Sequence, residues 1–167
     1  NASRGQYPYL PVLDEILSQV KIECEENLGI IDIPLKQVIG TATAGRTQSF
    51  AANFMPLHSY GSEFALKWAR LVEAQINEGI RDPIKVYEYM NRYYVIEGNK
   101  RVSVLKYMNC PTITAEVIRK VPARTDDIEN QIYYEFIRYK LTLIHIFLSL
   151  FSKLCAVFNV GSEDISC

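Results

Sequence analysis

The sequence is poor in the side chains that bind metals or form cross-links. Its four cysteines lie far apart with no C-x-x-C pair, and it has only two histidines, His58 and His145. A structural zinc site requires closely spaced ligand pairs, so no metal site is predicted. Neither histidine has a serine or cysteine partner in a motif, which removes support for a hydrolase triad. Free thiols are typical of a reducing compartment, and we therefore expect a cytoplasmic protein.

The sequence also has no excess of either charge. It contains 18 basic and 19 acidic residues, for a formal net charge of −1. General attraction to nucleic acids or anionic membranes requires a clear basic excess, so these functions are not expected of the chain as a whole. A local basic site remains compatible with this balance. At 167 residues the chain is long enough for one domain with a real core.

Glycine and proline divide the N-terminal half into short segments. Apolar residues at helical spacing from Leu13 onward predict a first helix that ends at Leu28-Gly29. The run GIIDIPL, residues 29–35, predicts a strand. The small and polar segment IGTATAGRTQSF, residues 39–50, predicts a loop that re-enters a helix near Ser49.

The central part of the chain has more regular patterns. The spacing of apolar residues predicts an amphipathic helix over 62–78, with the single tryptophan, Trp68, packed in the core. Two alternating runs, IKVYEYM and YYVIEG, flank Asn91-Arg92 and predict a β-hairpin. A helix over 99–108 and a strand over 112–121 complete this region.

The C-terminal part is unusually apolar. A long helix is predicted from Asp126 onward, and its segment 141–160 is apolar almost all round, with the length of a membrane span. Charged and polar residues within a span are costly, so we expect this helix to form a homo-oligomer interface instead of crossing a membrane. The residues that interrupt the apolar segment are His145, Ser149, Ser152, Lys153 and Asn159.

The stretch EGNKR, from Glu97 to Arg101, places two cations where a helix should begin. The start of a helix is already electropositive, so neither cation is expected to stabilise the unliganded fold. Gly98 permits close approach of a ligand, while Lys100, Arg101 and the first helical N–H groups suit anionic oxygens. The stretch therefore predicts a phosphate site. The alternative is a solvated turn in which Glu97 pairs with Arg101.

In the order of its elements, the chain resembles the ParB/sulfiredoxin superfamily over residues 29–121. The resemblance rests on ARLVEAQINEGIRDPIKVYEYMNRYYVIEGNKRVSVLKYMN, which is similar to a family pattern of I-x-x-G-I-x-x-P-I-x-V, a hairpin and G-x-x-R. It implies an α/β (α+β) fold with a small mixed sheet flanked by helices. Three regions are then expected: an N-terminal helix in 1–28, a ParB/sulfiredoxin-like core in 29–121, and an apolar helical extension in 122–167.

The resemblance implies that the chain binds a nucleotide, with ATP or CTP and Mg²⁺ as the ligands. The segment TAGRTQSF is similar to the arginine-bearing segment of the family. Members of a kinase branch have an acidic residue before the glycine, and Glu97 would hold magnesium or take a hydroxyl proton there; a surface ion pair is the alternative. The histidines common in that branch are missing. The implied phosphate-binding residues are Gly98, Asn99, Lys100, Arg101, Arg46 and Thr47.

Departures from the family narrow these expectations. Asn99 stands where sulfiredoxins carry their catalytic cysteine, so reductase activity is not expected. No helix-turn-helix module follows, as it does in ParB partition proteins, so sequence-specific DNA binding is not expected either. If the chain is an enzyme, it would be kinase-like or a nucleotide hydrolase. The alternatives are a noncatalytic domain that dimerises and, third, a ParB-like nuclease or DNA-associated protein.

Overall fold

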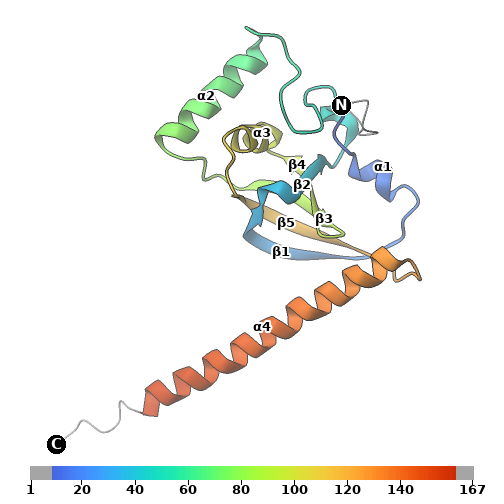
Figure 1. The fold of residues 1–167 in the computed structure, drawn as a ribbon, viewed down its shortest axis with the longest axis vertical. Coiled ribbons are helices and arrows are strands. Elements are labelled where there is room, and N and C mark those ends of the chain that lie inside the picture. The colour runs from blue at the N-terminus through green and yellow to red at the C-terminus, as the bar shows by residue number, and fades with distance from the viewer. Residues whose placement is uncertain (1–8, 161–167) are drawn as a thin grey trace, which may run out of the picture. The chain divides into compact units, whose positions relative to one another are not determined.

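A computed structural model describes residues 9–160, with side chains described as far as residue 155. The chain divides into two compact units, residues 1–123 and 124–167. Within the described part, the first unit contains a five-stranded mixed sheet flanked by helices (Figure 1), so the expected α+β fold class is confirmed. The strands are β1 (Ile22–Pro34), β2 (Val38–Thr41), β3 (Ile84–Tyr89), β4 (Arg92–Glu97) and β5 (Thr112–Pro122). The helices of this unit are α1 (Leu13–Leu17), α2 (Glu63–Asn77) and α3 (Asn99–Tyr107), with 3₁₀ turns η2 (Leu35–Gln37) and η3 (Ala44–Arg46).

The order of the strands, β1-β5-β3-β4-β2, places the hairpin next to β5. Strands β3 and β4 are antiparallel, and the turn residues Met90 and Asn91 both have positive φ, as a tight hairpin turn requires. After β4 the chain enters α3 and then returns as β5, parallel to β3. Side chains of α3, including Val102 and Leu105, belong to the same core cluster as the buried face of the sheet. The start of α3 is therefore fixed directly beyond the end of β4.

The prediction that the first helix extends to Leu28-Gly29 is wrong. The helix α1 ends at Leu17, and β1 begins at Ile22 and pairs with β5 over its whole length. This pairing gives the backbone groups of β1 hydrogen-bond partners on β5 in place of partners within a helix, so tertiary structure overrides the local pattern. The boundary between the two units lies after Ala123. Residues 1–8 of the expected N-terminal region lie outside the described residues.

The helix expected near Ser49 is also absent from the described structure. Between η3 and α2 the chain is irregular. An isolated antiparallel bridge pairs Phe50 with Pro56 in this segment. Phe50 and Phe54 are fully buried and fasten this segment to the core. The next helix begins at Glu63, where the Ser62 hydroxyl accepts a hydrogen bond from the Ala65 N–H.

The second unit consists mainly of one uninterrupted helix, α4 (Ile128–Val160), about 50 Å long at the usual rise per residue (Figure 1). Two of its hydroxyls bond to carbonyls of the same helix: Thr142 to Arg138 and Ser152 to Ser149. Among the described residues, no helix meets the combined length and apolarity that a membrane crossing requires. The exposed large apolar side chains from residue 141 onward are Leu141, Leu143, Ile144, Ile146, Phe147, Leu148, Leu150, Phe151 and Leu154.

Candidate functional site

A pocket of about 290 Å³ lies where β4 ends and α3 begins. The structure brings Arg46, from η3, to the same pocket as the EGNKR stretch, which follows it by about fifty residues of sequence. Three cationic side chains and one carboxylate line the pocket, a formal excess of two positive charges. Its lining residues are Arg46, Phe50, Phe64, Ile96, Glu97, Gly98, Asn99, Lys100 and Arg101.

Gly98 is required by the backbone and by its neighbour in the core. Its φ is +106°, a left-handed conformation that side chains with a Cβ rarely adopt. A Cβ at this position would lie 2.4 Å from Cγ2 of Ile84, which is fully buried in β3. The glycine thus lets the end of β4 pack directly against β3 and places the first turn of α3 at the pocket.

The start of α3 is not neutralised by the protein. Gly98 is the N-cap residue and contributes no side-chain hydrogen bond, and the first turn contains no acidic residue. The N–H groups of a first helical turn have no partner within the helix and carry a partial positive charge. An anion in the pocket would therefore meet both these N–H groups and the cationic side chains.

Arg101 is bound mainly by the protein's own backbone. Its Nη1 donates hydrogen bonds of 2.9 Å to the carbonyl oxygens of Asp82 and Pro83, in the loop before β3. Its Nη2 lies 4.0 Å from a carboxylate oxygen of Glu97, and its side chain is only 20% exposed. These contacts favour a stabilising role for Arg101 in the unliganded fold, against the expectation from the sequence. The Glu97 side chain is 67% exposed, so it is a surface carboxylate in a long ion pair.

Lys100 contacts an aromatic ring instead of a carboxylate. Its Nζ lies 4.5 Å from the centroid of the Phe64 ring, which in turn stacks on His58 at 4.2 Å. The pKa of Glu63 is lowered mainly by the hydrogen bond and charge of Lys67, with a smaller contribution from the charge of Lys100. Within the described part of the chain, Lys100 has no ion pair within 4.0 Å. Its charge is therefore available to an anion in the pocket that it lines.

Arg46 and Thr47, both predicted to bind phosphate, line different pockets. Arg46 is exposed, lines the pocket and makes no ion pair or side-chain hydrogen bond among the described residues. The Thr47 hydroxyl instead donates to the Ala44 carbonyl at 2.8 Å, and Thr47 lines a different pocket together with residues 9–12. Arg46 is thus grouped with the EGNKR stretch, and Thr47 is not.

Sequence reasoning missed the aromatic wall of the pocket. Phe50 and Phe64 contact each other with ring centroids 5.4 Å apart, and both line the pocket. The helical spacing of Phe64 indicated only a core position, and no local pattern linked Phe50 to a site. Among residues 9–160, no group of three or more His, Cys, Asp or Glu side chains is placed to hold a metal ion.

The comparisons with known proteins concern the fold. No protein-family model matches the chain, and no curated protein matches it. The chain is similar to the crystal structure of a sulfiredoxin from Arabidopsis thaliana, with 19% identity and a TM-score of 0.37, covering 53% of this chain and 82% of the sulfiredoxin. It is also similar to the C-terminally truncated chromosome-partitioning protein ParB from Caulobacter crescentus complexed with CTP-gamma-S. That similarity has 16% identity and a TM-score of 0.38, and covers 63% of this chain and half of the ParB chain.

Sulfiredoxin and ParB are the two classes of protein that the sequence resembles. At these identities and TM-scores, neither similarity bears on the chemistry of the pocket. The chemistry has to be inferred from the side chains and backbone groups that the chain itself places there.

Proposed function

We propose that this chain binds a phosphate-bearing ligand, and specifically a nucleotide, in the pocket at the start of α3. The observation that carries the proposal is the convergence of Arg46 and Lys100 on a helix start that has no side-chain cap and no acidic residue in its first turn. Cationic side chains near the partial positive charge of a helix start repel it and lower the stability of the fold. A bound anion removes this repulsion. Phosphate groups bind such helix starts in many unrelated proteins.

The lining residues have different roles in this proposal. The N–H groups at the start of α3 would donate to phosphate oxygens, with Arg46 supplying a planar fork and Lys100 a point charge. Arg101 acts chiefly as a positioning residue, because its Nη1 already holds the loop before β3. Each charge-assisted hydrogen bond to the ligand would contribute about 1.5–3 kcal/mol.

The size of the pocket suits part of a nucleotide. About 290 Å³ is at the lower limit for ligand pockets and accommodates phosphate groups with an adjoining sugar. A second pocket of about 690 Å³ also has Arg101 in its wall. Glu97 is the one carboxylate among the lining residues, and it would contribute to holding Mg²⁺ bound to the phosphates of ATP or CTP.

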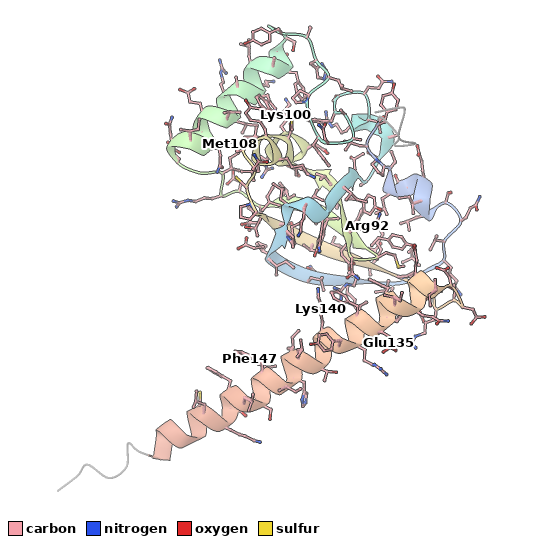
Figure 2. All side chains as sticks on the ribbon, viewed as in Figure 1. Arg92, Lys100, Met108, Glu135, Lys140 and Phe147 are labelled. Carbon is pink, nitrogen blue, oxygen red and sulfur yellow. The ribbon has the colours of Figure 1, made fainter. Side chains whose placement is uncertain are left out.

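Calorimetric titration of the full chain with pyrophosphate, ATP and CTP tests the proposal. We expect binding by the parent chain and at least tenfold weaker binding after Arg46→Ala, as loss of one charge-assisted hydrogen bond predicts. Arg92→Ala is the matched control, because Arg92 is exposed at the other end of β4, well apart from Lys100 (Figure 2). Absence of binding to all three ligands, or equal losses in the two variants, would contradict the proposal.

A second function, self-association, is favoured by α4. Nine large apolar side chains between Leu141 and Leu154 are exposed, more than a soluble chain ordinarily leaves in contact with water. We propose a second copy of the chain as the partner of this segment. Light scattering over micromolar concentrations is expected to show dimer or larger species for residues 1–167 and monomer after removal of residues 141–167. A monomer with the segment intact would exclude this partner.

A further inference from the structure

One buried polar atom at the pocket has no partner. The Oδ1 atom of Asn99 is buried and has no hydrogen-bond partner among the described residues, and the residue as a whole is only 7% exposed. Asn99 is also the first residue of α3 and part of the pocket lining. Buried polar atoms in folded proteins are nearly always paired, so an unpaired acceptor on a residue that lines a pocket is a candidate partner for a ligand group that enters there.

The chemistry of this atom restricts what that ligand group can be. A side-chain amide oxygen only accepts hydrogen bonds, and the oxygens of an ionised phosphate also only accept them. A bare phosphate therefore cannot satisfy Oδ1 and would be repelled by it, although the N–H groups at the same helix start attract phosphate. A phosphate-bearing ligand that also pairs with Oδ1 has to present a hydrogen-bond donor beside its phosphate.

We propose that Asn99 selects, among phosphate-bearing ligands, those that carry a hydroxyl group near the phosphate, as a ribose does. This inference rests on the proposed function and specifies its substrate class: ribonucleotides are preferred over their dideoxy analogues. A site that has a buried acceptor for a hydroxyl discriminates against the analogue that lacks it, because the acceptor is then left unpaired. The Asn99 side chain thus acts as a specificity determinant, while its backbone belongs to the phosphate-binding helix start.

The experiment compares ATP with 2′,3′-dideoxy-ATP, and CTP with 2′,3′-dideoxy-CTP, by calorimetry of the full chain in EDTA. We expect the parent chain to bind the ribonucleotide roughly two- to tenfold more tightly, as one neutral hydrogen bond predicts. In Asn99→Leu the ratio of the two affinities should fall to about one. Asn99→Ala serves as a second variant in case leucine does not fit, and the parent chain alone already tests the preference.

Stability provides an independent readout. Removing an unpaired buried acceptor should move the urea midpoint of the unliganded chain upward in Asn99→Leu. Asn77→Leu, on an exposed asparagine at the end of α2, should move it less, because only the helix propensity changes there.

Three outcomes would overturn the inference. Equal binding of ribonucleotide and dideoxynucleotide by the parent chain refutes the role of Asn99 and leaves the phosphate site intact. A preference that arises only when Mg²⁺ is added would show that a cation pairs with Oδ1. No binding of any of the four nucleotides would refute the proposed function and this inference together.

Discussion

The two halves of the pocket are held in different ways. On the α3 side, Gly98 is wedged against Ile84 and Arg101 is bonded to two backbone carbonyls. On the other side, Arg46 ends the short turn η3, just before the irregular segment that Phe50 anchors in the core, and its side chain has no partner among the described residues. The two arginines of the pocket, Arg101 and Arg46, thus have different roles. One binds the protein and shapes the site, and the other is available to a ligand.

The largest effect is expected at the rigid half, from Gly98→Ala. The added Cβ would overlap Cγ2 of Ile84 and would require alanine at a φ of +106°. Left-handed strain and overpacking each cost about 1–3 kcal/mol, so the free energy of unfolding should fall by roughly 2–6 kcal/mol in urea melts. Gly79→Ala is the control, because Gly79 has a φ of +78° but open space around it. Equal losses in the two variants would show that contact with Ile84 is unimportant.

Substitution of Arg101 should mainly lower the stability of the fold, and substitution of Arg46 should mainly weaken ligand binding. Arg101→Ala removes two hydrogen bonds to carbonyls from a mostly buried side chain, and should lower the free energy of unfolding by about 1.5–3 kcal/mol. Arg46→Ala should change it by less than about 0.5 kcal/mol, as is usual for surface substitutions, while weakening pyrophosphate binding more. Urea melts and calorimetry of both variants provide the comparison. A stable Arg101→Ala chain would return Arg101 to the role of a ligand-binding residue.

The same contrast explains how much the sequence could predict. The helix from Glu63, the β3–β4 hairpin and the glycine before α3 all follow from spacing and turn residues within a few positions of each other. The carbonyl partners of Arg101 lie 18 and 19 residues earlier in the chain, and no local pattern points to them.

Longer-range pairing accounts for the failures of the sequence predictions. Residue Glu25, expected in a helix, lies opposite Lys120 in the β1–β5 ladder and forms an ion pair with it. The expected helix at Ser49 is replaced by a segment whose conformation depends on burying Phe50 and Phe54 in a core built mostly from later residues. Residues that meet only after folding leave no periodic signal, and this is also why the buried oxygen of Asn99 could not be foreseen.

The smallest effect is expected for Lys100, which combines features of both halves. It belongs to α3, but its ammonium group lies over the Phe64 ring and forms no ion pair within 4.0 Å among the described residues. Removing a cation from a helix start stabilises by about 0.3–1 kcal/mol, and losing an exposed cation–π contact costs about 0.5–1 kcal/mol. These contributions nearly cancel, so Lys100→Met should leave the urea midpoint almost unchanged.

Binding should respond to Lys100→Met more clearly than stability does. The loss of one partly exposed charge predicts roughly two- to fivefold weaker pyrophosphate binding, with a weaker dependence on salt than in the parent chain. Calorimetry at two salt concentrations measures both quantities, and Lys85→Met, an exposed lysine on β3 that does not line the pocket, is the matched control. If the salt dependence is unchanged, the Lys100 charge does not act on the ligand. The attraction would then have to come from Arg46 on one side of the pocket and from the N–H groups of the helix start on the other.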